Sequence, residues 1–349
     1  MREASVKGGT GNRPKRVTLA EVARLAGLSP TAASMILTGR PDTRLSAEAH
    51  AKVMAAAQQL GYRPNVAARS LRTDRTQSIA FISDVVATTR FATGLIRGAL
   101  HAAEQAGHVM LMLETGGEPA REVEAMQAAL DRGVDGLVFA AMRAREIFVP
   151  ELPISAPVVM LNATNSRFPV SVLADEEQGG RTAVRALAEA GIASGIALLG
   201  QSDAAEQGLF RSETVARRVR GIRAEMAARG MVFAAEASCW NWEPEEGYRL
   251  TRKLLRGSTG LKALLCMNDR LAFGAYQALG DMGFKVPGEI SLVSFDNDEI
   301  AAYLRPGLTT VALPHEEMGR LAVKLLLERG TDGEHLVPMP AIFRQSIRH

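Results

Sequence analysis

From residue 78 onward, the sequence alternates apolar runs of strand length with amphipathic runs of helical period, and this alternation restricts the possible folds. The strand-like runs are residues 78–82, 108–113, 136–140, 196–199, 263–267 and 291–295. The helix-like runs are residues 91–106, 118–130, 176–190, 215–229, 245–255 and 271–280. Strand–helix–strand repeats build parallel sheets covered by helices. A second set of repeats begins near Ala174, so we expect an α/β body of two lobes with a cleft between them.

The N-terminal part instead predicts short helices with clear end signals. Thr18 precedes an apolar stripe at helical spacing, and Glu21 follows three residues later, which makes a capping box. Gly27 is free to adopt the positive φ of a tight turn. Ser29 is expected to cap a second helix that has Pro30 at its first position.

A third helix is expected between Ser46 and Gly61. Two helices joined by a short glycine turn and braced by a third form a helix-turn-helix, although a generic three-helix bundle gives the same pattern. In the second helix, the residues expected to face inward are Ala33, Ile36 and Leu37. Its outer face carries Pro30, Thr31, Ser34 and Met35.

Positive charge is concentrated near the N-terminus. Residues 1–76 contain 13 Lys and Arg against 5 Asp and Glu, whereas the formal net charge of the whole chain is only +3. A basic head on an acidic body is the electrostatic layout of a DNA-binding module joined to a sensor. Residues 1–16 are basic and rich in glycine, which predicts a flexible arm.

Residues 62–72 form a short basic segment that contains one large apolar residue, Leu71. Such a segment is too short to be a stable helix on its own in water. A basic helix with a protruding leucine is suited to insertion between base steps in the minor groove. A solvated linker is the alternative interpretation.

Several motifs of the head resemble the lactose-repressor/galactose-repressor (LacI/GalR) family of bacterial regulators. They are Val17-Thr18-Leu19, Val22-Ala23, Ala26-Gly27-Leu28-Ser29, Gly61-Tyr62-Arg63-Pro64-Asn65 and Ala68-Arg69-Ser70-Leu71-Arg72. The resemblance runs from Val17 nearly to the end of the chain. It implies a homodimer that binds a pseudo-palindromic operator, with recognition helices in the major groove and paired hinge helices in the minor groove.

The resemblance implies DNA contacts at positions in the head and hinge. They are Thr18, Ser29, Pro30, Thr31, Ser34, Met35, Asn65, Ala68, Arg69, Leu71 and Arg72. Met35 stands where an arginine is common in the family, and methionine cannot make a bidentate contact to guanine. Thr38 stands where asparagine is usual. We therefore expect an operator that differs from the family's most common one.

Polar residues just after the predicted strands, together with a tryptophan, are candidate effector contacts. Asp and Asn can pair with sugar hydroxyls, and an aromatic face packs against a sugar ring. Helix capping and turn formation are the alternative roles. The resemblance favours effector contacts at Asp84, Asn162, Trp242, Asn268, Asp269 and Asp296, and at Arg217 or Arg218 with the register left open. The segment 83–91 departs from the family pattern, so the identity of the effector stays open.

The expected organisation has an N-terminal all-α head and a body that resembles the periplasmic sugar-binding-protein fold. The segments are 1–16 as a flexible arm, 17–62 as the helix-turn-helix domain and 63–76 as the hinge and linker. The N-terminal lobe is expected to contain 77–173 plus about 306–335, and the C-terminal lobe 174–305 plus about 336–349.

The sequence contains no motif of an enzyme. There is no glycine-rich dinucleotide fingerprint, P-loop or nucleophile elbow, and the six histidines show no metal-ligand spacing. We expect no catalytic residues, no cofactor and no metal. Cys239 and Cys266 are expected to be a buried, reduced pair. The first residues lack a signal-peptide pattern, which suggests a cytoplasmic protein without a membrane segment.

The sequence predicts a ligand-gated DNA-binding repressor whose effector is a small sugar or sugar-like molecule. No leucine heptad follows Pro340, which favours a dimer over a tetramer. A transport-type sugar-binding protein is the second hypothesis, and a doubly wound enzyme is the third. The predicted head argues against both.

Overall fold

The computed structural model describes residues 17–38, 45–63, 75–89, 92–201, 212–330 and 332–348. The chain divides into two compact units, Met1–Thr76 and Gln77–His349, here called the head and the body. The expected arm over residues 1–16 lies outside the described residues, as does most of the expected hinge.

The described part of the head contains three helices, α1 (Leu19–Ala26), α2 (Pro30–Leu37) and α3 (Ala47–Leu60). The predicted end signals are confirmed. Thr18 and Glu21 form a complete capping box, and Ser29 caps α2 by accepting a hydrogen bond from the amide of Ala32. Gly27 ends α1 with a φ of 68°, a left-handed conformation that glycine adopts without a Cβ clash. The helices bury a small core of Val22, Ala23, Ala26, Ala33, Ile36, Val53, Ala56 and Ala57.

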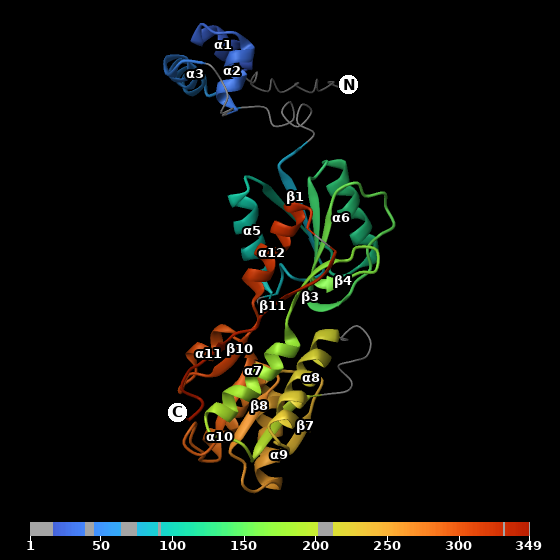
Figure 1. The fold of residues 1–349 in the computed structure, drawn as a ribbon, viewed down its shortest axis with the longest axis vertical. Helices are drawn as coiled ribbons and strands as arrows, with labels where there is room; N and C mark the ends of the chain where they lie inside the picture. The colour runs from blue at the N-terminus through green and yellow to red at the C-terminus, as the bar shows by residue number, and fades with distance from the viewer. Residues whose placement is uncertain are drawn as a thin grey trace, which may run out of the picture. The chain divides into compact units, whose positions relative to one another are not determined.

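The first lobe of the body is a six-stranded parallel sheet in the order β11-β5-β4-β3-β1-β2 (Figure 1). Its strands are β1 (Ser78–Ser83), β2 (Val109–Glu114), β3 (Gly136–Glu146), β4 (Val158–Thr164), β5 (Val170–Ala174) and β11 (Gly333–Val337). Its helices are α5 (Thr93–Gln105), α6 (Pro119–Asp131) and α12 (His315–Glu328).

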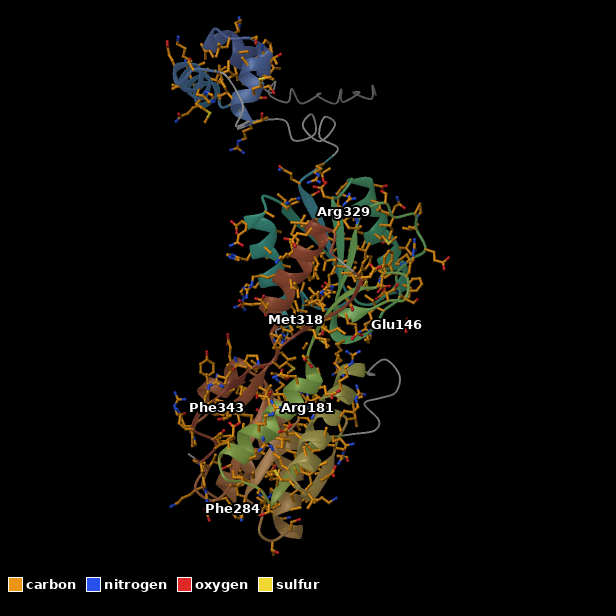
Figure 2. The ribbon with its side chains drawn as sticks, viewed as in Figure 1. Glu146, Arg181, Phe284, Met318, Arg329 and Phe343 are labelled. Carbon is orange, nitrogen blue, oxygen red and sulfur yellow. The ribbon has the colours of Figure 1, made fainter. Side chains whose placement is uncertain are left out.

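Alternate residues of β1 pack against helices on opposite faces of this sheet. Ile79 and Phe81 share a core with α5 and α12, whereas Ala80 and Ile82 share a core with α6. Met318 of α12, labelled in Figure 2, is fully buried in the first of these cores. A strand that is buried on both faces reads as a continuous apolar run, which is why the sequence predicted it.

The second lobe has a sheet in the order β12-β10-β9-β8-β6-β7, in which only β12 is antiparallel to its neighbour. Its strands are β6 (Ile196–Gln201), β7 (Phe233–Ser238), β8 (Ala263–Cys266), β9 (Ser291–Asp296), β10 (Thr309–Ala312) and β12 (Ala341–Ile342). Its helices are α7 (Glu176–Glu189), α8 (Glu213–Ala228), α9 (Pro244–Gly257), α10 (Asp269–Asp281) and α11 (Glu299–Tyr303). The α/β class with two lobes is therefore as predicted.

The chain passes between the two sheets three times, after β5, after β10 and after β11. The first crossing falls at Ala174, as the sequence suggested. The second falls after Ala312 rather than near residue 306, because β10 pairs with β9 in the second sheet. The third falls after Val337, because β11 pairs with β5 along its whole length. Both later boundaries depend on strands too short to show a clear pattern in the sequence.

Three pairs of helices cross at close range through glycine. The pairs are α5 with α12, α7 with α8, and α9 with α10, and each helix contributes one glycine to its crossing. A Cβ atom at any of these glycines would lie only 1.9–2.2 Å from a backbone carbonyl oxygen of the partner helix. The glycines are Gly98 and Gly319, Gly180 and Gly221, and Gly247 and Gly274. Only glycine permits these backbones to approach so closely.

Replacing Gly319 by alanine should destabilise the body, because the added Cβ would lie 2.1 Å from the carbonyl oxygen of Leu95. Overpacking of this kind costs about 1–3 kcal/mol. Gly280→Ala is the matched control, since this α10 glycine has nothing within 4 Å of its Cβ position. That change should raise stability by about 0.5–1 kcal/mol. Urea unfolding measures both, and equal shifts would contradict the close-crossing interpretation.

Candidate functional site

The candidate effector site centres on Arg218 of α8, whose side chain is 3% exposed. Its Nε and Nη2 donate to the two carboxylate oxygens of Glu176 at 2.6 and 2.9 Å. Its Nη1 donates to the carbonyl oxygen of Met267 at 2.7 Å. Glu176 begins α7 and Met267 follows β8, so three elements of the second lobe hold one guanidinium.

Two aromatic rings and a second carboxylate complete the surroundings of Arg218. The guanidinium carbon lies 4.3 Å from the ring centroid of Phe295 and 5.9 Å from that of Trp242. Both distances are within cation–π range. Asp296, at the end of β9, places Oδ1 3.9 Å from Nη2 of Arg218. Its backbone has a φ of 105°, which is rare for a residue other than glycine.

Negative charge exceeds positive charge around this guanidinium. Burial alone would lower the pKa of Arg218, but Glu176, Asp296 and Asp269 raise it above its usual value, so the side chain stays charged. Burial raises the pKa of Asp296 to about 7. Arg218 opposes this rise, and Asp269, Glu176 and Asp298 add to it. Asp296 therefore changes protonation state near neutral pH.

Trp242 and Asn268 are tied to each other and to the second sheet. The indole Nε1 of Trp242 donates to the carbonyl oxygen of Gly200 at 2.7 Å. Asn268 caps α10 by accepting from the amide of Leu271 at 2.8 Å, and its Nδ2 donates to the carbonyl oxygen of Trp242 at 3.3 Å. The capping alternative for Asn268 is thus correct. The cap also fixes the position of the tryptophan beside Arg218.

Asp269, which was predicted to contact effector, lies beneath Asp296 and bonds to groups within the second lobe. Its side chain is fully buried. It accepts hydrogen bonds from the hydroxyl of Ser294, from the hydroxyl of Thr310 at 2.8 Å and from the amide of Asp298 at 2.8 Å. Its role is to hold the segment that follows Asp296. Burial raises the pKa of Asp269 to about 6, and the hydrogen bonds oppose that rise.

Arg217 and Arg218, between which the sequence left the register open, point in different directions on α8. Arg217 donates through both Nη atoms to the carboxylate of Glu334 at 2.7 and 2.8 Å. Glu334 belongs to β11, so this pair joins the second lobe to the first. This pair is partly exposed, with the two side chains 22% and 40% exposed. Arg217 thus points away from Asp296 toward the first lobe, whereas Arg218 lies beside Asp296.

Asp84 and Asn162 lie together at the carboxyl end of the first sheet. Asp84 accepts from the amide of Met142 at 3.0 Å and pairs with Arg145 at 3.0 Å. Asn162 has a φ of 51° and donates to the carbonyl oxygens of Ala141 and Met142 at 2.9 and 3.1 Å. Both side chains thus fasten the same irregular part of β3.

Sequence reasoning missed four residues around these groups, namely Glu114, Arg145, Glu176 and Phe295. Glu114 of β2 accepts hydrogen bonds from Ser83, from the amide of Ala87, and from the amide and hydroxyl of Thr88. It therefore holds the loop that departs from the family pattern. Glu176 comes just after β5, so the expectation that ligand contacts follow strands covers Glu176 as well as Asp296. The sequence did not predict β5, and for that reason it did not indicate Glu176.

An open cleft of about 630 Å³ lies where residues of both lobes meet. The second lobe contributes Asp296 and the residues that follow it, up to Glu299. The first lobe contributes Thr93, Gly94 and Arg97 of α5 and the first turns of α12. Asp296 therefore reaches a cleft that a small molecule can enter.

The predicted DNA-contacting residues of the described part of the head lie at helix ends and on α2. Thr18 and Ser29 are exposed N-caps, Pro30 and Thr31 are exposed, and Ser34 and Met35 are half-buried. Ala33 and Ile36, on the other face of α2, are buried in the core as expected. The hinge predictions at Asn65, Ala68, Arg69, Leu71 and Arg72 lie outside the described residues.

Other predicted features concern metals, cysteines and membranes. Among the described residues, no group of three or more His, Cys, Asp or Glu side chains is placed to bind a metal ion. Cys239 and Cys266 are both buried free thiols, as predicted. In the same part of the chain, no helix is long and apolar enough to cross a membrane.

The fold and site together define a class: a helix-turn-helix head followed by a two-lobed body of the binding-protein type. Residues 18–65 match the family model described as bacterial regulatory proteins, lacI family. Residues 184–347 match the model of a periplasmic binding protein-like domain.

Relatives and solved structures match over most of the chain. The ribose operon repressor of Haemophilus influenzae is 28% identical over 89% of this chain and 91% of its own length. The transcriptional repressor PurR of Vibrio parahaemolyticus is 29% identical over 91% of this chain and 93% of its own length. A lac repressor dimer bound to operator and the anti-inducer ONPF has a TM-score of 0.73 and 26% identity, covering 96% of this chain and 100% of that chain.

The chain thus combines a helix-turn-helix head of the lacI family of bacterial regulatory proteins with a periplasmic-binding-protein-like body. It is a DNA-binding transcriptional regulator and not an enzyme, as these repressor relatives confirm.

Arg218→Ala should destabilise the body strongly, because it leaves Glu176 buried without its partner. Breaking a buried pair costs about 3–5 kcal/mol. The neighbouring change Arg217→Ala removes a partly exposed pair and should cost less, about 1 kcal/mol. Denaturant unfolding of the two variants checks this, and a larger cost for Arg217→Ala would reverse the assignment.

Proposed function

We propose that this protein is a homodimeric repressor that binds a pseudo-palindromic operator and is controlled by a small, uncharged polyhydroxylated effector. The observation that carries the effector part is Asp296, which lies beside the buried Arg218 and also lines the cleft between the lobes. DNA as partner implies that the protein acts in the cytoplasm.

The charge balance of the site supports an uncharged effector. Glu176, Asp269, Asp296 and Asp298 surround the single guanidinium of Arg218. An anionic ligand on this side of the cleft would meet an excess of negative charge. Hydroxyl groups can instead donate to the Asp296 carboxylate and accept from the remaining N–H groups of Arg218. Trp242 supplies an aromatic face beside them.

The effector contacts proposed for this chain are Asp296, Arg218, Asn268 and Trp242 in the second lobe, and Asp84 and Asn162 in the first. In the head, Pro30, Thr31, Ser34 and Met35 of α2 are proposed to read or contact the operator, with Thr18 and Ser29 near phosphate. The hinge residues Asn65, Ala68, Arg69, Leu71 and Arg72 are proposed to enter the minor groove. The head is what separates this proposal from a transport-type sugar-binding protein, for which a body alone is sufficient.

Operator binding should weaken steeply with salt, because a basic head and hinge release counterions from phosphates. With about 6–10 phosphate contacts per dimer, affinity should fall roughly 10³–10⁵-fold between about 50 and about 200 mM salt. The experiment selects genomic fragments with the full-length protein and titrates the best fragment by gel shift. Failure to select any fragment, or a flat salt response, would overturn the repressor assignment.

Effector affinity should depend on pH through Asp296. Its pKa in the free protein is raised to about 7, and the carboxylate is the form that accepts hydroxyl donors. Acidification from about pH 8 to about pH 6 should therefore weaken binding roughly tenfold, and affinity should level off above about pH 8. The effector comes from a thermal-shift screen of sugars and polyols, followed by calorimetric titration.

The matched control is Asp296→Asn, which keeps the shape of the side chain without a titrating group. It should bind the same effector more weakly, with little change over this pH range. A parent protein with pH-independent binding would contradict the role of Asp296, as would a variant that keeps the pH dependence.

A further inference from the structure

The first residue of the body, Gln77, has an unusual backbone conformation. Its φ is 52°, in the left-handed region that non-glycine residues rarely adopt. Asn162, Asp296, Asn297 and Arg329 share this sign of φ, but the first three are Asn and Asp residues toward the carboxyl ends of strands, and Arg329 is the C-cap of α12. Gln77 lies at the opposite end of the first sheet and lacks the short polar side chain that eases the strain. Such a conformation persists only where the surroundings enforce it, and it often marks a functional position.

Residues at the starts of the two strands that flank β1 form hydrogen bonds with both the amide and the carbonyl group of Gln77. Its amide donates to Oδ2 of Asp135 at 2.9 Å, and its carbonyl oxygen accepts from the amide of Val109 at 2.8 Å. The amide of Asp135 also donates to the carbonyl oxygen of Ser78 at 2.8 Å. Asp135 directly precedes β3 and Val109 begins β2, so the start of β1 is fixed from two sides.

His108 orients the Asp135 carboxylate that accepts from the amide of Gln77. Its Nε2 lies 3.4 Å from Oδ2 of Asp135, and the two side chains are 11% and 12% exposed. Its Nδ1 lies 2.9 Å from the carbonyl oxygen of Ala106. The ring is therefore held between a backbone acceptor and the Asp135 carboxylate, and the same carboxylate oxygen receives the amide of Gln77. We call Gln77, His108 and Asp135 the exit clamp.

We propose that the exit clamp is a positioning device for operator binding: Asp135, oriented by His108, holds Gln77 so that the linker leaves β1 in a set direction. Gln77 lies on the only covalent path from the body to the head. A change of φ at this residue rotates everything that precedes it in the chain. The inference rests on the proposed operator binding and adds the residues through which the body controls it.

The test uses the full-length protein, the genomic fragment that the parent selects, and a random-sequence duplex of equal length. Asp135→Ala removes the acceptor, and Gln77→Pro removes the amide donor and forces a negative φ. Both should lower affinity for the selected fragment by about 5–150-fold, the usual range of coupling between sites. Affinity for the random duplex should stay within about twofold, since phosphate contacts carry it.

Two conservative variants are the matched controls. Gln77→Gly keeps the amide donor and tolerates a positive φ, and Asp135→Asn keeps an oxygen that can accept from the amide. Both should bind the selected fragment like the parent. Thermal melting gives the folded fraction of each variant, and affinities are compared at equal folded concentration. If Asp135→Ala fails to fold, the comparison of Gln77→Pro with Gln77→Gly decides alone.

Parent-like binding of the selected fragment by Asp135→Ala and Gln77→Pro would overturn the positioning role. An equal loss on both DNAs would also overturn it, because a purely structural clamp affects all binding alike. A parent protein that selects no fragment would instead overturn the proposed function itself, so the two failures are distinguishable.

Discussion

The close crossing of α7 and α8 through Gly180 and Gly221 is the constraint on which the candidate site depends. A Cβ at Gly180 would lie 2.2 Å from the carbonyl oxygen of Arg218, and a Cβ at Gly221 would lie 2.0 Å from that of Glu177. Gly180 therefore lies against Arg218 of the buried ion pair. Gly221 lies against Glu177, the residue that follows Glu176. Helices that are kept further apart could not bring the Arg218 guanidinium and the Glu176 carboxylate into bidentate contact. The crossing of α9 and α10 through Gly247 and Gly274 likewise brings the start of α9, just after Trp242, close to α10, which Asn268 caps.

The buried pair also sets the chemistry of the cleft. Two charges out of water are tolerable only when their hydrogen bonds are satisfied, and Arg218 meets this condition through Glu176 and a carbonyl group. Burial of Asp296 raises its pKa, Arg218 opposes that rise, and Asp269, Glu176 and Asp298 add to it. A carboxyl that titrates near neutrality results, and it faces a cleft shared by both lobes. This arrangement favours a ligand that offers hydroxyl donors over one that brings negative charge.

The first sheet connects two places where the backbone is unusual. At its carboxyl end, Asn162 and Asp84 fasten the irregular part of β3. At its amino end, Asp135, just before β3, holds Gln77 at the start of β1. Since β1 and β3 are hydrogen-bonded neighbours in one sheet, both places belong to a single tightly packed unit. The sheet thus connects the proposed effector contacts of the first lobe to the proposed exit clamp.

The sequence alone determined the features that depend on local patterns. The caps at Thr18, Ser29 and Ser46, the helix-turn-helix and most of the long strands and helices could be read from spacing, because capping and amphipathicity act over a few residues. It also singled out Asp296, because it follows a predicted strand, and Trp242, as an aromatic face, and the structure places both side chains beside Arg218. Tertiary structure decided what depends on direction and distance. It showed that Arg218 points inward whereas Arg217 points to Glu334, that Asp269 lies beneath the site, and that β10 belongs to the second sheet. Neighbouring residues on a helix point about 100° apart, and only packing shows which of them is buried.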